Sequence, residues 1–324
     1  MRAEPSLSFV LLYNRVHTNP PAITKSISQL HSCLSLFPSS ICLNYIMVVL
    51  EKGLSGALNA KVTGSGNEAI ILAHGFGGDQ SVWDKILPYL AKHCRVLVFD
   101  WSFSGAVKDP NLYDPVKYSS YDAFANDLIS LIEELNLKSS VFVGHSMSGI
   151  IGCIASIKRP DLFKSLILIG ASPRYINADG YEGGFSDAEI EDIISNMESN
   201  FYNWAQAFAS AVVDAKDPPS VDMFSKCLQR MRPEFAVPVA KTVFYSDERD
   251  VLEKVMTPCI IVQTTRDIVV PNSVAYYMQE KIKGESTVEI IETDGHFPHL
   301  TAHLQLLDVL TAVMNFNGPK NIST

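Results

Sequence analysis

The segment Val141–Gly149, Val-Phe-Val-Gly-His-Ser-Met-Ser-Gly, constrains the fold more than any other part of the chain. A short apolar run ends at Gly144, and an apolar run compatible with a helix begins at Gly149. This order predicts a strand, a sharp turn and a helix, with Ser146 at the apex of the turn. Such turns usually read Gly-x-Ser-x-Gly, whereas here Ser148 takes the last position and the glycine follows one place later. The turn holds a serine hydroxyl above the edge of a sheet, so Ser146 is the candidate nucleophile.

The composition is that of a folded globular chain with an acidic balance. The 324 residues are 47% hydrophobic and 19% charged, and the formal net charge is −9. Nucleic-acid binders carry a basic footprint, so no nucleic-acid partner is expected. The longest apolar candidate, Ile41–Leu50, is too short to cross a bilayer, and no membrane partner is expected. The 6 cysteines show no zinc-like spacing, which predicts reduced thiols in an intracellular protein and no metal site. No cofactor is expected either.

The order of strand and helix patterns along the chain predicts one α/β domain with a helical insertion. Strand and helix patterns alternate over residues 47–185 and again over 247–317, with a tail at 318–324. Alternation of this kind indicates a mostly parallel central sheet flanked by helices. One of the predicted helices covers Asp79–Lys92. Residues 186–246 show only helical patterns, which predict a cap of four helices.

Residues 1–46 differ in character from the rest of the chain. They are rich in serine, contain Glu4 as their single acidic residue, and carry prolines that break any long helix. One interpretation is a disordered extension, or an upstream start with Met47 as the alternative beginning. The other is an organelle transit peptide, which would direct the protein to a plastid.

Two later strand ends carry the partners that a serine nucleophile needs. An imidazole must take the hydroxyl proton, and a carboxylate must hold that imidazole. Asp267 follows one predicted strand and His296 follows the last one, at the sheet edge that also carries Ser146. Asp294 is a rival acid, but its nearness to His296 in sequence would strain the required geometry. The sequence therefore predicts the catalytic triad Ser146, Asp267 and His296.

Acyl transfer also needs two backbone N–H groups that bind the developing oxyanion. Met147, directly after the nucleophile, offers one of them. Phe76, in the glycine-rich loop His74–Gly78, offers the other. This loop has neither Gly-x-Gly-x-x-Gly nor the lysine of a phosphate-binding loop, so a phosphate cradle is disfavoured.

Large aromatic residues in and before the cap are candidates for the lining of a substrate pocket. Trp204 and Phe208 lie one helical turn apart, and for both, pocket lining and ordinary core packing remain open. An aromatic cavity with few charges would select a small, apolar, uncharged ester or lactone. The pocket candidates are Phe76, Tyr175, Trp204, Phe208, Phe224 and Phe244.

These residues lie within a wider resemblance that spans about Leu58 to Phe316. The chain resembles the strigolactone and karrikin receptor family of plant α/β-hydrolases in the segments His74–Trp83, Phe142–Ser148, Arg159–Phe163, Ala171–Tyr175 and Gly183–Phe185. Within that family, Asp100–Gly105 and Gly144–Gly149 are most similar to the DWARF14-like 2 branch. In this family the turn that carries the nucleophile, here called the elbow, also ends in serine, so Ser148 fits the resemblance.

The resemblance implies an α/β-hydrolase fold with a V-shaped four-helix cap, and slow hydrolysis of a butenolide by Ser146, Asp267 and His296. It further implies a cytoplasmic and nuclear monomer whose partners are an F-box protein and transcriptional repressors. The receptors carry an Asp-x-x-Gly-x-Gly loop where this chain has Trp101 to Gly105, a difference that bears on signalling more than on hydrolysis. Two alternatives stay open: a ligand-binding signalling module with incidental hydrolysis, and a general carboxylesterase.

Overall fold

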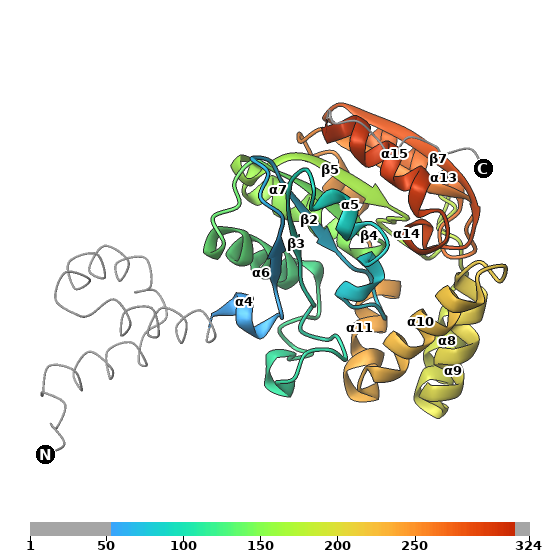
Figure 1. The fold of residues 1–324 in the computed structure, drawn as a ribbon. Coiled ribbons are helices and arrows are strands. Elements are labelled where there is room, and N and C mark those ends of the chain that lie inside the picture. The colour runs from blue at the N-terminus through green and yellow to red at the C-terminus, as the bar shows by residue number, and fades with distance from the viewer. Residues whose placement is uncertain (1–52, 315–324) are drawn as a thin grey trace, which may run out of the picture. The chain divides into compact units, whose positions relative to one another are not determined.

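A seven-stranded sheet forms the centre of the computed structural model, which describes residues 53–314 (Figure 1). The strand order is β1-β3-β2-β4-β5-β6-β7, and every neighbouring pair is parallel except β1 with β3. This confirms the predicted mostly parallel sheet. The strands are β1 (Lys61–Thr63), β2 (Ala69–Ala73), β3 (Arg95–Val98), β4 (Ser140–His145), β5 (Phe163–Ile169), β6 (Cys259–Arg266) and β7 (Ser286–Asp294).

The central strands are buried because helices cover the sheet. Every residue of β2 and β4 is buried, and β2 reads Ala-Ile-Ile-Leu-Ala without an alternating polar residue. Continuous apolar runs of this kind are what a covered parallel sheet requires. The short antiparallel strand β1 is exposed along its whole length, and the sequence pattern did not predict it.

Helices follow most of the strands and pack against the sheet. Helix α7 packs on β4 and β5, α6 packs on α7, and α13 packs on β6 and β7. The helices outside the cap are α4 (Leu54–Ala57), α5 (Leu87–Leu90), α6 (Tyr121–Glu134), α7 (Met147–Lys158), α12 (Arg249–Leu252), α13 (Asn272–Lys281), α14 (Pro298–Thr301) and α15 (His303–Met314). The 3₁₀ turns within residues 53–314 are η2 (Gln80–Trp83), η3 (Pro110–Leu112) and η4 (Pro160–Leu162).

The prediction of a single helix over Asp79–Lys92 is wrong. The structure has the 3₁₀ turn η2 and the short helix α5 in its place. Pro88 explains the break, because it lacks the N–H that would bond to Asp84 and its ring would collide with that carbonyl. It is tolerated in the first turn of α5, where no intrahelical partner is needed.

The predicted four-helix cap is present between β5 and β6. Figure 1 shows its helices gathered at one end of the sheet, in yellow and orange. Helix α9 packs against α8 and α10, and α8 packs against α11. The cap helices are α8 (Asp187–Ser199), α9 (Phe201–Val212), α10 (Pro218–Arg230) and α11 (Pro233–Tyr245).

Several expectations concern residues outside 53–314. The extension 1–46, the tail 318–324, Cys33 and Cys42 all lie there. The four cysteines within the described range are buried free thiols. In the same range, no helix has the length and apolar character needed to span a membrane, and no group of three or more histidine, cysteine or acidic side chains is arranged to hold a metal ion.

Candidate active site

Ser146 stands at a strained turn between β4 and α7. Its φ of 56° and ψ of −124° are unusual for a residue with a side chain. Two glycines let the strand and the helix approach closely enough for this turn. A Cβ on Gly144 would lie 2.6 Å from the carbonyl carbon of Ser148, and one on Gly149 would lie 2.5 Å from the Cβ of Ala171. The elbow predicted from the sequence is therefore formed, with Gly149 serving the close approach one place later than usual.

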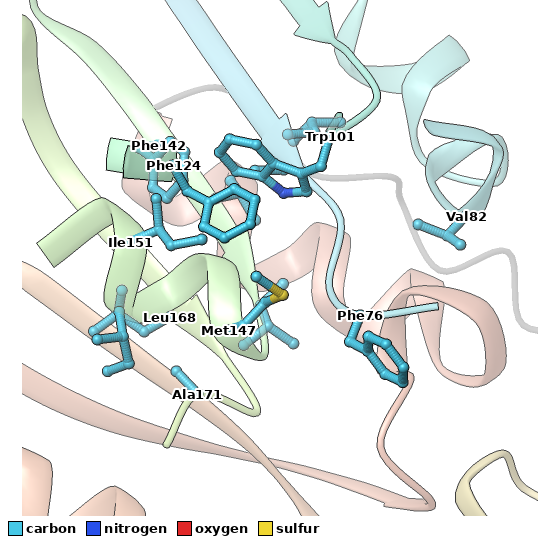
Figure 2. Packing of buried hydrophobic residues seen from close by; sticks show 14 of the residues in the cluster. Phe76, Val82, Trp101, Phe124, Phe142, Met147, Ile151, Leu168 and Ala171 are labelled. Atoms are coloured by element: carbon cyan, nitrogen blue, oxygen red, sulfur yellow. The ribbon is translucent and has the colours of Figure 1, made fainter. Parts of the chain in front are cut away.

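Ser148 ties the elbow to the glycine-rich loop. Its Oγ donates a hydrogen bond of 2.6 Å to the carbonyl oxygen of His74 and accepts one of 2.9 Å from Nε1 of Trp101. The Trp101 indole also packs edge-on against Phe124, and Figure 2 shows both rings near Met147. A glycine at position 148 could form neither hydrogen bond. The two departures noted in the sequence, Ser148 and Trp101, thus belong to one buried network.

Asp267 and His296 come together at the carboxyl ends of β6 and β7. Nδ1 of His296 donates to Oδ2 of Asp267 at 2.6 Å. Two backbone N–H groups of the following turn and the amide of Gln263 also donate to this carboxylate, which fixes its position. The proton on Nδ1 leaves Nε2 of His296 free to accept a proton. The rival acid Asp294 instead forms an ion pair with Arg266.

The Ser146 hydroxyl faces the same cavity as His296 but bonds to a different group. Its Oγ lies 3.2 Å from the phenolic oxygen of Tyr175. Nε2 of His296 is buried and has no hydrogen-bond partner among the described residues. Burial raises the pKa of Tyr175, so this phenol stays neutral and able to donate. The structure brings the predicted triad together with its histidine–aspartate bond formed and its serine–histidine bond not formed.

The two predicted oxyanion donors flank Ser146. Met147 is the first residue of α7, so its N–H has no acceptor within the helix. The glycine-rich loop passes directly against the elbow, since a Cβ on Gly75 would lie 3.0 Å from the Cβ of Ser146. Phe76 is the next residue of this loop and is buried. The backbone arrangement is therefore compatible with an oxyanion site between the loop and the start of α7.

An aromatic-lined cavity lies between the elbow and the cap. Ser146 and His296 both line it, which places the nucleophile and the base at one surface. Five of the six predicted pocket residues also line it: Phe76, Tyr175, Phe208, Phe224 and Phe244.

Trp204 is the sixth predicted pocket residue, and it lies behind the lining. Its indole stacks on Phe208 with ring centroids 4.9 Å apart, and it contacts Phe76 at 6.4 Å. Trp204 is absent from the residues that line the cavity. Its contacts fit ordinary core packing between the cap and the glycine-rich loop, which was one of the two interpretations left open by the sequence.

Known proteins share this architecture. A family model described as the alpha/beta hydrolase family matches residues 70–309. This chain belongs to the α/β hydrolase family. The match includes Ser146, Asp267 and His296, and it ends within α15.

Relatives of this α/β hydrolase cover nearly its whole described range. The strigolactone esterase RMS3 of Pisum sativum is 46% identical over 247 residues, which are 76% of this chain and 92% of that protein. The karrikin insensitive 2 receptor IA of Petunia hybrida is 42% identical, with 79% and 94% covered. A solved hydrolase structure, olei00960 from Oleispira antarctica, superposes with a TM-score of 0.79 at 32% identity, covering 82% of this chain and 98% of that one. The relatives from Pisum sativum and Petunia hybrida confirm the resemblance to the strigolactone and karrikin receptor family.

Sequence reasoning missed three apolar residues that line the cavity: Phe297, Val269 and Val243. Phe297 follows His296 directly, and Val269 lies two residues after Asp267. An apolar side chain within two residues of a predicted catalytic residue was the available signal. Val243 precedes Phe244 in α11, and helical spacing alone does not distinguish a lining valine from a core valine.

Two further histidines of this α/β hydrolase are buried behind the catalytic one. Nε2 of His145 donates to the carbonyl oxygen of His296 at 3.0 Å, which links the elbow to the histidine loop. His299 is fully buried, with its ring 4.6 Å from that of His145 and 4.5 Å from that of Trp83. Burial lowers the pKa of His299 to about 3 and that of His145 well below its ordinary value. Both imidazoles are therefore neutral in the folded protein.

The free energy of unfolding is expected to decrease as the pH falls below about 6.5. The unfolded chain binds a proton on His299 near pH 6.5, but the folded chain does so only near pH 3. Between these values the unfolded state holds more protons, so acid favours unfolding. His299 alone accounts for about 2 kcal/mol between pH 6.5 and 5. Urea unfolding at several pH values measures this slope.

The matched variant for this prediction is His299→Phe, which keeps a ring against Trp83. The slope of unfolding free energy against pH should be shallower in the variant, because one buried titrating group is gone. Equal slopes in the two proteins would contradict the prediction.

Proposed function

We propose that this α/β hydrolase binds a small apolar butenolide of the strigolactone or karrikin type and hydrolyses it slowly. The observation that carries the proposal is that His296, bonded to Asp267 at 2.6 Å, lines one aromatic cavity together with Ser146. The printed names of the relatives, strigolactone esterase and karrikin insensitive 2 receptor, support the ligand class.

In the proposed reaction, Ser146 attacks the ligand carbonyl while His296 takes the hydroxyl proton on Nε2. Asp267 holds the imidazole and stabilises its positive charge. The backbone N–H groups of Phe76 and Met147 bind the oxyanion of the tetrahedral intermediate. When the intermediate collapses, the bond between the carbonyl carbon and the ring oxygen breaks, and the protonated His296 gives its proton to that oxygen. The resulting hemiacetal releases the enol half of the ligand, and the opened ring stays on Ser146, or passes to Nε2 of His296, until water hydrolyses this bond.

Tyr175 offers a physical reason for slow turnover. The Ser146 hydroxyl is bonded to the Tyr175 phenol, at 3.2 Å, and must leave this partner before it can donate to His296. A serine nucleophile is activated when its proton can pass to an adjacent base within hydrogen-bond reach. The F-box and repressor partners, the monomeric state and the cytoplasmic and nuclear location remain predictions drawn from the resemblance alone.

The test is a fluorogenic butenolide analogue that releases its fluorophore when the enol-ether bond is cleaved. Saturable release is expected, together with a covalent ring adduct that intact-mass spectrometry and peptide mapping place on Ser146 or His296. Turnover of p-nitrophenyl acetate far above that of the butenolide would favour the general carboxylesterase. A ligand-dependent shift in Tm without fluorophore release would favour the binding module.

A further inference from the structure

The cavity at Ser146 is much smaller than an ordinary ligand pocket. Its volume is about 20 Å³, whereas pockets for small molecules usually measure roughly 300–1,000 Å³. Such a space has room for about one or two water molecules. A carbonyl that carries any sizeable group can therefore reach Ser146 only if part of the aromatic wall moves.

Phe224 and Phe297 both line this cavity. Phe224 comes from cap helix α10, and Phe297 comes from the loop between β7 and α14. Their ring centroids are 4.2 Å apart at 46°, so the rings are in direct contact. Phe224 is 0% exposed and Phe297 is 3% exposed, and each ring is held by packing alone. The pair joins the cap to the catalytic layer across the cavity.

The same two rings reach from the oxyanion loop to the catalytic histidine. The Phe297 ring lies 4.6 Å from that of His145 and 5.5 Å from that of His296. At the other end, Cζ of Phe224 lies 3.2 Å from the position of a Cβ on Gly77. The pair therefore borders the space that the group attached to an attacked carbonyl would enter.

Phe208 and Phe244 also line the cavity, but they pack on aromatic residues that do not line it. Phe208 stacks on Trp204 within the cap. Phe244 packs on Phe185 at 6.2 Å as well as on Tyr175. Each of these two rings has an aromatic neighbour outside the lining, whereas the aromatic partner of Phe224 is Phe297, which is itself a lining residue. Loss of either member of the pair would enlarge the cavity directly.

We propose that the Phe224–Phe297 pair is the specificity-determining wall of this hydrolase. It limits substrates to compact esters and lactones and excludes long acyl chains. The proposal rests on the proposed function and narrows its substrate class. A small unsaturated lactone ring enters by displacing the pair slightly, while an extended chain would have to separate the two rings completely.

The test compares p-nitrophenyl acetate, butyrate, hexanoate and octanoate as substrates of the wild type and Phe297→Ala. The wild type should prefer acetate. The variant should raise the octanoate-to-acetate ratio of kcat/KM at least about tenfold, since the added methylenes then gain apolar contacts. Phe163→Ala is the matched control, because Phe163 is buried at the start of β5 and does not line the cavity. Its ratio should equal that of the wild type.

A second readout needs no turnover and separates this proposal from the proposed function. Thermal shifts with γ-butyrolactone and γ-dodecalactone should show that the wild type is stabilised by the short lactone only and Phe297→Ala by both. Should Phe297→Ala fail to fold, Phe297→Leu and Phe224→Leu are expected to move both readouts in the same direction by smaller amounts. The proposed role of the Phe224–Phe297 pair would be overturned if the wild type bound the long lactone as well as the short one. Folded variants with unchanged selectivity would overturn it too. Absence of hydrolysis with selective binding would overturn only the proposed function.

Discussion

Ser146→Ala is expected to lower the rate of butenolide hydrolysis by at least about 10³-fold while the protein stays folded. The substitution removes the attacking oxygen, and neither Tyr175 nor His296 can replace it as a nucleophile at a comparable distance from the oxyanion donors. The main structural loss is the hydrogen bond between Ser146 and Tyr175. Its cost is about 1 kcal/mol. Fluorophore release under single-turnover conditions measures the effect, and circular dichroism checks the fold.

The control for this prediction is Ser165→Ala. Ser165 is also a buried serine, lies near the start of the neighbouring strand β5, and its hydroxyl has no hydrogen-bond partner among the described residues. This variant should keep the wild-type rate. Similar rates for Ser146→Ala and the wild type would show that Ser146 is not the nucleophile.

Asp267→Asn has the second large expected effect, a loss of about 10⁴-fold in kcat. The asparagine carbonyl can still accept from the backbone N–H groups that now bond to Oδ1 of Asp267. Its NH₂ group would then face Nδ1 of His296 and the amide of Gln263, where the carboxylate oxygen now accepts both bonds. His296 would have to carry its proton on Nε2, and in that tautomer it cannot take a proton from Ser146.

Asp294→Asn is the matched control for Asp267→Asn. Asp294 is also near His296 in sequence, but its carboxylate pairs with Arg266 and Lys216. Loss of these partly exposed ion pairs should leave kcat within about twofold of the wild type, because such pairs contribute little. A pH–rate profile extends the comparison, since only Asp267→Asn should change the protonation behaviour of the base. If Asp294→Asn had the larger effect, the roles of the two acids would be reversed.

The triad could be predicted from the sequence because its placement follows from chain order and strand ends. Parallel strands present their carboxyl ends at one edge of a sheet, so residues after successive strands meet there. Ser146, Asp267 and His296 each follow a strand of this sheet directly or within two residues. The cap was predictable for a similar reason, since a long stretch without strand pattern must form helices outside the sheet. Pro88, by contrast, broke a helix that the apolar spacing alone favoured.

The hydrogen-bond partners of Ser148 could not be predicted from the local sequence pattern. The sequence marks Ser148 as a departure from the usual elbow, but its partners lie 74 residues away at His74 and 47 residues away at Trp101. Only the fold brings these groups within hydrogen-bonding distance. The serine then links the nucleophile turn to the oxyanion loop.

By itself, the sequence determined the fold class, the order of the catalytic residues and the aromatic character of the pocket, because each depends on periodicity or on chain order. The tertiary structure decided which aromatic rings line the cavity and how much space they leave. Helical spacing tells which face of a helix is apolar, but not which layer a ring occupies once elements from the cap and the core meet. Trp204 therefore lies behind the lining, and Phe297 stands inside it against Phe224.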